Sequence, residues 1–418
     1  MRTTFFSPDA LTRTYLMRAT DALASATATY AIPLLVLVTT GSTALTGVAF
    51  VLEWTPRLAA FAFAGTLVDR FGSHRVFRMS NFVRATAVAL AASVLLSLPD
   101  AGTPTTCVVL AFGAISGLLA EVSFVAVETI GAEASRELGY AAHRVQAVQT
   151  GIDQSAMLVG PLLGGLLLLA GPGVLLALIT LLALLAAVAV PLHAAETERS
   201  PVPSNLLTGC RTLRRIPALT WLVGGLAASN LATGVLQAAA PIMVIHRFGS
   251  STAAVGAIWS TAAVGSLAAV WITRRAIDRF QVWPVGAVTA AISTAACTVT
   301  ALAPNFGFYI AAVAVVMSGE GALTVVLRTL RSRLIPAEAF GSTLAVTIIL
   351  VLLPLPLAGA LIAAVPAAQL PHLLLACTVL QGAALSACFV ALRRHRIDGT
   401  PSRLASTSAE SAEPLGAR

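Results

Sequence analysis

The chain has 418 residues, of which 57% are hydrophobic and only 11% are charged, and its formal net charge is +8 at pH 7. Soluble domains carry about a quarter charged residues, so this composition excludes an ordinary soluble protein. In a soluble protein the positive charge would suggest nucleic acid, but here the arginine positions indicate that it reflects membrane topology.

Apolar stretches of 18 or more residues recur from one end of the chain to the other. A helix of that length crosses about 30 Å of hydrocarbon, and only helices or closed barrels satisfy their backbone hydrogen bonds in lipid. Because the runs are continuous rather than alternating, we predict an all-α membrane protein. The twelve predicted spans are residues 14–38, 44–67, 76–97, 106–131, 146–170, 173–193, 218–245, 250–273, 284–303, 307–330, 341–365 and 370–392.

The spans fall into two sets of six, which predicts an N-terminal half at residues 1–193 and a C-terminal half at 218–396. Residues 194–217 form a polar linker and are predicted to be the one long internal loop. The tail at 397–418 is rich in Ser, Ala, Pro and Glu, a composition typical of disorder.

Arginine counting across the short loops predicts the orientation. With the N-terminus placed in the cytoplasm, the cytoplasmic loops receive nearly all the arginines, and the opposite side receives only Arg247. The cytoplasmic set is Arg2, Arg13, Arg70, Arg75, Arg78, Arg136, Arg144, the linker arginines, Arg274, Arg275, Arg279, Arg328, Arg331, Arg333, Arg393, Arg394 and Arg396. We therefore expect a multi-pass protein of the cytoplasmic (inner) membrane with both termini in the cytoplasm.

A short motif occurs at the same place in each half. Val68-Asp69-Arg70-Phe71 follows the second span, and Ile277-Asp278-Arg279-Phe280 follows the eighth. The two aspartates are 209 residues apart, which is half the chain length. This match indicates two parallel six-helix repeats, as found in one large class of transporters.

Three segments resemble the major facilitator superfamily. The stretch from Gly65 to Arg75 resembles its loop between helices two and three, in which a glycine precedes Asp-Arg, a second glycine and basic residues. The stretch from Ala156 to Gly165 resembles the helix-five signature of its antiporters, G-x-x-x-G-P-x-x-G-G, with alanine at the first glycine. The stretch from Arg331 to Gly341 resembles the loop after helix ten in the macrolide-efflux and enterobactin-exporter branch.

This resemblance implies the major facilitator fold, in two pseudo-symmetric six-helix halves, and secondary transport. It further implies a gating loop, with Asp69 as a latch in one access state, and an antiporter-like helix five. One feature departs from the family: many proton-coupled members carry an arginine in helix four, where this chain has Glu121 and Glu128. The implied residues are Gly65, Asp69, Arg70, Gly72, Arg75, Asp278 and Arg279 for gating, and Gly160, Pro161, Gly164 and Gly165 for helix five.

Ionisable residues inside the predicted spans need a reason, because each costs about 2.5–3.5 kcal/mol at the bilayer centre. Arg18 and Asp21 lie three residues apart, and Glu53 and Arg57 lie four apart, so each couple is predicted to share a helix face and pair. Such pairs have a purely structural interpretation. The functional alternative is that an acid in an apolar cavity holds the coupling proton, and the candidates are Asp21 and Glu53 first, then Glu121, and then Glu320.

Polar stripes on two helices predict a substrate cavity. Gln149 and Asp153 lie on one face of helix five, and Asn230 and Gln237 lie on one face of helix seven. Ordinary interhelical hydrogen bonding is the alternative for both stripes. The arginines Arg18, Arg57 and Arg84 are candidates for contact with a negatively charged solute.

The leading hypothesis for function is a proton-coupled exporter of a small amphipathic molecule, such as a drug-like compound or a siderophore. The alternative is an importer of an organic anion or metallophore with the same fold. The chain has no P-loop, no H-E-x-x-H and no paired Cys/His ligand set, so an enzyme, a cofactor and a metal site are not expected. The expected partners are the solute, protons and the lipid bilayer, without nucleic acid, and the protein is expected to act as a monomer.

Overall fold

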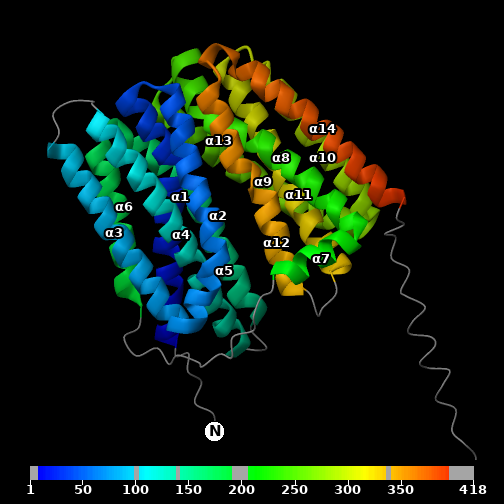
Figure 1. Ribbon diagram of the computed structural model, residues 1–418, viewed down its shortest axis with the longest axis horizontal. Helices are drawn as coiled ribbons and strands as arrows, with labels where there is room; N and C mark the ends of the chain where they lie inside the picture. Colours follow the sequence, from blue (N-terminus) through cyan, green and yellow to red (C-terminus); the bar gives the residue numbers. More distant parts are fainter. Residues whose placement is uncertain (1–7, 98–102, 138–141, 191–205, 336–339, 395–418) are drawn as a thin grey trace, which may run out of the picture.

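The computed structural model describes residues 8–97, 103–137, 142–190, 206–335 and 340–394, and the regular structure in these ranges is helical. The first six helices form one bundle and the later ones a second bundle beside it (Figure 1). The N-terminal half holds α1 (Pro8–Thr40), α2 (Thr43–Phe71), α3 (Ser73–Ser97), α4 (Thr103–Glu137), α5 (Ala142–Ala170) and α6 (Pro172–Ala189). The C-terminal half holds α8 (Pro217–Ile242), α9 (Thr252–Phe280), α10 (Val282–Ala301), α11 (Phe306–Leu334), α12 (Phe340–Leu352), α13 (Pro354–Ala364) and α14 (Leu370–Arg394). A π-helical turn (Met243–Arg247) extends α8, and a 3₁₀ turn (Ala367–Gln369) precedes α14.

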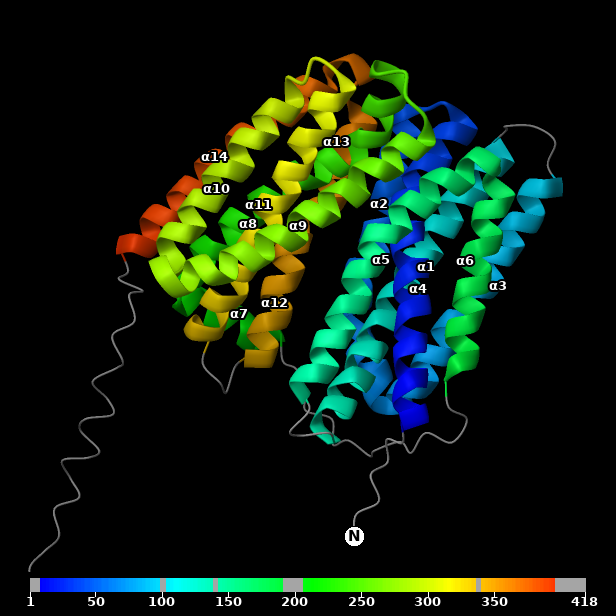
Figure 2. The same cartoon turned by 180° about the vertical axis from the view of Figure 1, so that it is seen from behind.

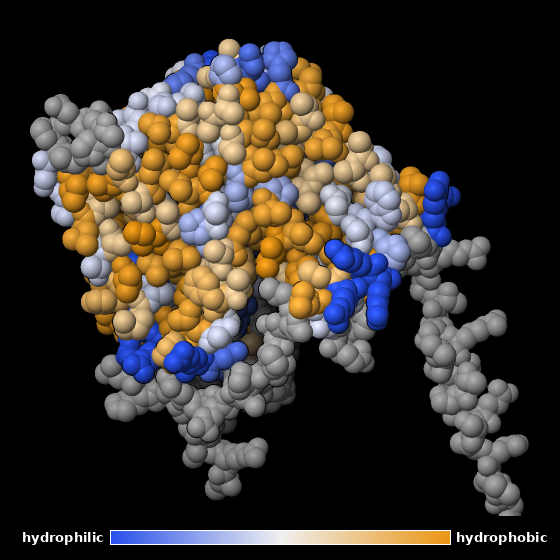
Figure 3. Space-filling view, viewed as in Figure 1, coloured by the Kyte–Doolittle hydropathy of each residue, from blue (hydrophilic) through white to orange (hydrophobic). Residues whose placement is uncertain are grey.

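Twelve helical segments in the described ranges are long and apolar enough to cross a membrane, which confirms the predicted number. Each overlaps one of the predicted spans. The middle of the molecule is mostly hydrophobic on the face drawn in Figure 3, and hydrophilic residues gather at its two ends. This distribution fits a protein whose middle lies in hydrocarbon.

The linker prediction was wrong in one respect, because residues Leu206–Arg215 form a short helix, α7. This helix is amphipathic: Leu213 is buried while Arg214 and Arg215 are exposed. The high polarity of the segment concealed a helical spacing of its leucines. α7 packs on α12, where a Cβ on Gly209 would lie 2.3 Å from the carbonyl oxygen of Ser342. Residues 194–205 and the tail at 397–418 lie outside the described residues.

The predicted span 341–365 is also not one continuous helix. It breaks at Leu353 into α12 and α13. Proline is the cause, because Pro354 has no N–H to offer the carbonyl four residues before it. The amide of Asn230 on α8 donates to the carbonyl oxygen of Val351 at 2.8 Å and so satisfies one acceptor at the break.

The two halves repeat at a constant offset of 209 residues over two helices. α2 begins at Thr43 and ends at Phe71, while α9 begins at Thr252 and ends at Phe280. Both helices have a serine N-cap whose hydroxyl accepts a backbone N–H, Ser42 from Leu45 and Ser251 from Ala254. Both also end in a residue with positive φ, Gly72 at 84° and Gln281 at 69°. The backbone therefore repeats where the sequence repeats.

Two ends of the molecule are distinguished by their charges. The basic end carries the ends of α2, α9 and α14, with Arg70, Arg75, Arg275, Arg279, Arg393 and Arg394. The far end carries the start of α2 and of α9. Arg247, the one arginine predicted for the far side, donates to the carbonyl of Ala303 at 3.1 Å and caps the end of α10. Arg247 is the exception to the arginine asymmetry, and this hydrogen bond gives it a local structural role at the far end.

The halves touch at the far end through two equivalent helix crossings. In one, α2 meets α13, and a Cβ on Gly47 would lie 2.6 Å from the carbonyl oxygen of Gly359. In the other, α9 meets α5, and a Cβ on Gly165 would lie 2.5 Å from the carbonyl oxygen of Thr252. Gly47 and Gly256 are themselves 209 residues apart and both lie in these crossings. Small residues here let the backbones approach closely, as is common between membrane helices.

Toward the basic end the two bundles diverge, as both views show (Figures 1 and 2). The α5–α9 crossing is reinforced by two hydrogen bonds that join the halves. Thr252 donates to the carbonyl of Gly165 at 2.9 Å, and Ser260 donates to the carbonyl of Leu158 at 2.5 Å. The described contacts between the halves thus place the closed end opposite the basic end.

Candidate functional site

Arg84 on α3 is a fully buried charge, with a side chain that is 0% exposed. Its Nη1 donates to Ser25 at 2.9 Å and lies 3.4 Å from Asp21 Oδ1. Ser123 on α4 donates to the same carboxylate oxygen at 3.0 Å, and Asn81 donates to Ser123 at 2.7 Å. Three helices of the N-terminal half therefore close around one ion pair. These side chains face protein rather than lipid, as membrane-embedded charges usually do.

This arrangement corrects one predicted pairing. Arg18 and Asp21 lie on the same helix but do not pair with each other. Each finds a partner on another helix, because the long arginine side chain reaches α4 and α5 while the short aspartate meets α3 and α4. The short sequence separation indicated a possible pair. In the bundle, however, Arg18 contacts Glu128 and Asp153, and Asp21 contacts Arg84.

Arg18 forms the second charged cluster. Its Nε donates to Asp153 Oδ1 at 2.9 Å and its Nη2 lies 2.5 Å from Asp153 Oδ2, a bidentate contact with α5. The same Nη2 also contacts Glu128 on α4. The arginine side chain is 5% exposed, whereas Asp153 is 33% and Glu128 is 46% exposed. The cluster therefore joins a buried cation to two acids that reach accessible surface.

Glu53 and Arg57 form the predicted pair, with 3.0 Å between Nη2 and Oε1. Glu53 is 0% exposed on α2, and Arg57 also donates to Thr29 on α1 at 2.5 Å. The guanidinium lies over the ring of Trp54 at 4.9 Å from its centroid. Glu121 on α4 is half-buried and belongs to none of the ion pairs in the described ranges.

The C-terminal half holds one carboxylate at this depth, within its described spans, and it lies in a neutral setting. Ser229 on α8 donates to Glu320 Oε1 at 2.6 Å, and Ser293 on α10 donates to the same oxygen at 3.2 Å. Gln381 on α14 donates to both serines, at 2.9 and 3.4 Å. The described ion pairs do not include Glu320. We call Glu320, Ser229, Ser293 and Gln381 the Glu320 cluster.

Away from the helix ends, the described spans hold three arginines and six acids. The arginines are each paired with at least one acid. These nine residues are Arg18, Arg57, Arg84, Asp21, Glu53, Glu121, Glu128, Asp153 and Glu320. The membrane interior of this part of the chain therefore has an excess of carboxyl groups.

The remaining predicted cavity residues differ in their surroundings. Gln149 is 3% exposed and packs against Gly131, where a Cβ would lie 2.5 Å from its Nε2. Asn230 is engaged at the α12–α13 break. Gln237 is half-buried on α8. The structure therefore gives Gln149 and Asn230 packing roles, while Gln237 keeps accessible surface.

The helix-five motif forms contacts on two sides. Gly160 and Gly164 pack α5 against α1, where their added Cβ atoms would lie 2.7 Å from Ala26 Cβ and 3.1 Å from Ala31 Cβ. Gly165 and the carbonyl of Pro161 meet α9 of the other half. The motif therefore builds part of the closed far end.

The predicted gating residues lie at the basic end. Asp69 and Asp278 each precede an arginine that lies over the next phenylalanine, with Arg70 5.2 Å from the Phe71 centroid and Arg279 5.3 Å from the Phe280 centroid. Asp69 is exposed and takes part in none of the described ion pairs. The second copy of the motif thus has the same local geometry as the first. Gly65 lies one helical turn before Asp69 with open space around it.

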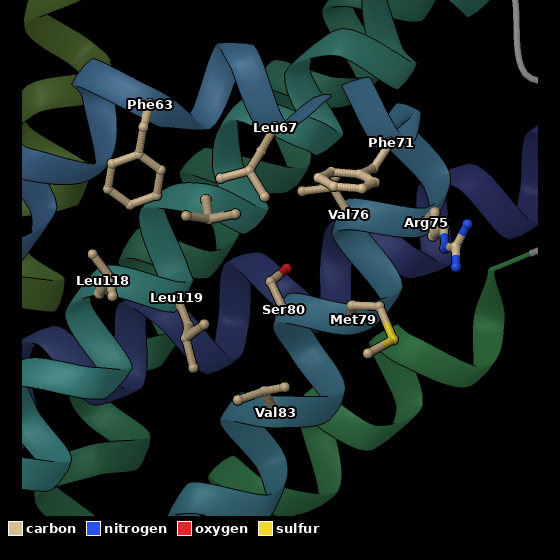
Figure 4. Close-up of a pocket in the computed structure, with 11 residues that line it drawn as sticks. Phe63, Leu67, Phe71, Arg75, Val76, Met79, Ser80, Val83, Leu118 and Leu119 are labelled. Carbon is tan, nitrogen blue, oxygen red and sulfur yellow. The ribbon is translucent and has the colours of Figure 1, made fainter. Parts of the chain in front are cut away.

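A groove of about 360 Å³ lies next to this loop, between α2 and α3 and above α4 (Figure 4). Its lining is apolar except for Ser80 and Arg75. Phe63, Phe71, Met79 and Val83 are exposed there. Because none of the embedded acids lines it, the groove is separate from the charged clusters.

Sequence reasoning missed the neutral members of these clusters. The sequence indicated Glu128 as an embedded acid but not as the partner of Arg18, and it did not single out Ser123, Asn81 or Gln381. Serines are abundant in apolar helices, so their type alone carries little signal. A useful signal is the period of 209 residues, which places Ser293 at the position equivalent to Arg84.

Twelve membrane-spanning helices in two repeated halves, with charged side chains held inside, define a membrane transporter of the secondary type. The Major Facilitator Superfamily family model matches residues 14–353, and the chain belongs to this superfamily. None of the curated proteins is similar to the chain in sequence.

Solved structures with the same fold have low sequence identity. A bacterial homologue of the iron transporter ferroportin, in an inward-facing state, has a TM-score of 0.72 at 14% identity, covering 91% of this chain and 98% of that one. A mutant form of the nucleoside transporter NupG has a TM-score of 0.73 at 12% identity, covering 91% and 99%. A bacterial homologue of the lysosomal transporter Spinster, inward-facing and unoccupied, has a TM-score of 0.67 at 13% identity, covering 94% and 98%.

Proposed function

We propose that the protein is a proton-coupled exporter that expels a small amphipathic molecule by alternating access. The observation that carries this proposal is the excess of acids over arginines inside the described spans, with each of these arginines already paired. Extra carboxyl groups in an apolar interior are suited to taking up and releasing protons. The solute class comprises drug-like compounds, siderophores and other secreted metabolites.

We place the basic end in the cytoplasm of a cell with an inner membrane, following the arginine asymmetry. In that orientation the closed far end faces outward and the halves diverge toward the cytoplasm. The conformation is then inward-facing. Export would proceed when the far-end crossings open and the basic end closes.

The proton carriers that we propose are Glu53 and Glu121. Glu53 has Arg57 as its one ion-pair partner among the described residues, and Arg57 packs against α4, the helix of Glu121, where a Cβ on Gly117 would lie 3.5 Å from Arg57 Cγ. A shift of Arg57 from one acid to the other would couple a proton to the rearrangement of α2 and α4. Asp21, ranked first together with Glu53 from the sequence, is held by Arg84 and Ser123 together, which supports a structural role.

An importer of an organic anion or metallophore is the alternative. It would use Arg18, Arg57 and Arg84 to bind the solute. Each of these arginines contacts an acid, so an anion would first have to displace a carboxylate. This arrangement favours export of a neutral or cationic molecule.

We also propose that Asp69 acts as a latch in the outward-facing state. Its exposure and its place outside the described ion pairs of the present conformation support that role. Gly65, Gly72, Arg70 and Arg75 would shape the same loop, with Asp278 and Arg279 as its counterpart. An Asp69→Asn variant is expected to slow transport without loss of folded protein, and unchanged transport would contradict the latch.

The assignment to the macrolide-efflux and enterobactin-exporter branch rests on the stretch Arg331–Gly341, part of which lies outside the described residues. A deletion strain tests it. We expect greater sensitivity to macrolides or accumulation of an intracellular siderophore. A deletion strain with neither change would contradict this branch, while leaving proton-coupled export of another solute in place.

The test of the function itself uses inverted membrane vesicles energised by a proton gradient. Wild-type protein is expected to drive solute uptake and proton release, whereas Glu53→Gln and Glu121→Gln are expected to lose most of the gradient-driven rate. Asp21→Asn tests the sequence-based ranking in the same assay. Ser318→Ala, which removes a hydroxyl bonded to its own helix, is the control. If all three acid variants transport at wild-type rates, the proton-coupled proposal fails.

The direction of transport is measured separately, by comparing solute accumulation in right-side-out and inverted vesicles. Accumulation in inverted vesicles alone supports export. Accumulation in right-side-out vesicles would favour the importer. Activity that scales with protein-to-lipid ratio without cooperativity supports the monomer.

A further inference from the structure

The hydrogen bonds of the Glu320 cluster all run toward the carboxylate. Gln381 donates to Ser229 and Ser293, and these two serines donate to Glu320 Oε1. A hydroxyl that accepts from an amide and donates to a carboxylate is polarised in one direction. Helices α8, α10 and α14 thus supply donors that favour a negative charge at Glu320 on α11.

The internal repeat shows that the position which supplies a cation in the N-terminal half does not supply one to Glu320. α3 begins at Ser73 and α10 begins at Val282, again 209 residues apart. Arg84 on α3 therefore corresponds to Ser293 on α10. In the N-terminal half that position supplies the cation for Asp21, and in the C-terminal half it supplies only a hydroxyl. The same offset places Asn230, not an acid, at the position of Asp21, so the acid of the second half lies elsewhere, and the residue at the position of Arg84 gives that acid a hydroxyl instead of a cation.

Two further features mark an incomplete site. Gln381 is 0% exposed, yet its Oε1 has no hydrogen-bond partner among the described residues, which is costly for a buried acceptor. Glu320 keeps accessible surface, while Ser229 and Ser293 behind it are 0% exposed. The cluster therefore combines a partly accessible carboxylate with two buried serines and one buried acceptor that lacks a donor.

We propose that Glu320 is the binding site for the positively charged group of an organic cation, which supplies the missing counter-ion. This inference rests on the proposed transport of an amphipathic molecule and specifies its charge. The carboxylate provides the attraction, and the serines, which accept from Gln381, donate hydrogen bonds that stabilise its negative charge. A cationic head on an apolar body fits an acid set in a membrane bundle of small apolar side chains.

A metal ion fits this cluster less well than an organic cation. Hard metal cations gather six or more oxygen ligands in many protein sites. Both serine oxygens here already donate to Glu320 and accept from Gln381. Besides the carboxylate itself, Gln381 Oε1 is the one other acceptor of the cluster that lacks a partner, which leaves too few oxygens for a hard metal ion. One cationic group, by contrast, needs only its charge neutralised.

The experiment is equilibrium binding to the purified full-length protein in lipid nanodiscs, with no proton gradient. Tetraphenylphosphonium and tetraphenylborate are the probes, because they have the same shape and opposite charge. We expect the wild type to bind the phosphonium more tightly than the borate. Glu320→Gln, which keeps the size of the side chain, should weaken phosphonium binding at least tenfold.

Two further variants separate charge from folding. Glu320→Asp keeps the carboxylate and is expected to retain binding within about fivefold. Gln381→Lys keeps Glu320 but adds an internal ammonium beside it, so it should lose phosphonium binding as Glu320→Gln does. Ser318→Ala on the same helix is the matched control and should bind within twofold of the wild type. Unchanged melting temperatures establish that the variants are folded.

Several results would overturn the proposal. They are equal affinity for the two probes, preference for the borate, absence of phosphonium binding, and full binding by Glu320→Gln. Displacement of the phosphonium by millimolar Na⁺ from the wild type would instead indicate a metal-ion site, and the proposal would fail. Because no gradient is present, a positive result stands even if transport proves not to be proton-coupled. A negative result leaves proton-coupled export of a neutral molecule intact.

Discussion

Arg84 Nη1 and Asp21 Oδ1 lie 3.4 Å apart inside the N-terminal half, where both side chains are at most 5% exposed. Removing one member of a buried pair leaves an uncompensated charge and costs about 3–5 kcal/mol, while removing both is often nearly neutral. We expect Arg84→Met to lower the melting temperature strongly, and Arg84→Met with Asp21→Asn to recover most of the loss. Thermal unfolding in detergent measures the difference. A double variant as unstable as the single one would contradict the pair.

The Arg18 cluster has two acids for one arginine, which predicts non-additive substitutions. Asp153→Asn or Glu128→Gln alone leaves the guanidinium with the other acid, so each should cost about 1 kcal/mol or less. The double variant leaves Arg18 buried without a carboxylate and should cost about 3 kcal/mol or more. A double-mutant cycle on thermal stability measures the coupling. Simple additivity would show that the two acids act independently.

Gln281 occupies a backbone conformation that suits glycine, with φ 69° and ψ 165°. Residues other than glycine in that region are strained by about 1–3 kcal/mol. Gln281→Gly is therefore expected to raise the melting temperature, since its counterpart Gly72 already has the favourable residue. Gly72→Gln should lower it. A lower melting temperature for Gln281→Gly would show that the glutamine side chain stabilises the turn by more than the strain it suffers.

The far-end crossings predict a conformational effect of adding one carbon. Gly165→Ala places a Cβ 2.5 Å from the carbonyl of Thr252, so α5 and α9 must separate. We expect the distance between spin labels at Leu96 and Leu302, on the far ends of α3 and α10, to lengthen in a background without native cysteines. Gly224→Ala is the control, because nothing lies within 4 Å of its added Cβ. An unchanged distance distribution in Gly165→Ala would contradict the role of this crossing.

Much of the fold was accessible from the sequence because lipid restricts the choices. Apolar runs of this length indicate membrane-spanning helices. The alternation of arginine-rich and arginine-poor loops provides an independent check on the number of these helices. The break at Leu353 was missed because Pro354 sits in a run that is otherwise continuous and hydrophobic. α7 was missed because three arginines in ten residues dominate its composition.

The site was less predictable than the fold. Glu53 and Arg57 pair as expected, because a spacing of four residues fixes both side chains on one face. Arg18 and Asp21 do not, since the partners of a long side chain depend on which helices pack beside it. The direction of the hydrogen bonds at Glu320 depends on helices that are up to 152 residues apart in the chain, from Ser229 to Gln381. No local pattern carries that information.

The break between α12 and α13 makes the two far-end crossings mechanically unequal. The crossing at Gly47 is made by α13, which is separated by a joint from α12 and from the α7 segment resting on it. The crossing at Gly165 is made by α5, which runs unbroken from Ala142 to Ala170. If the two halves rock against each other, the α12–α13 segment can bend at its break, whereas α5 would have to move as one continuous helix. The pseudo-symmetric architecture thus has an asymmetric path of motion built into it.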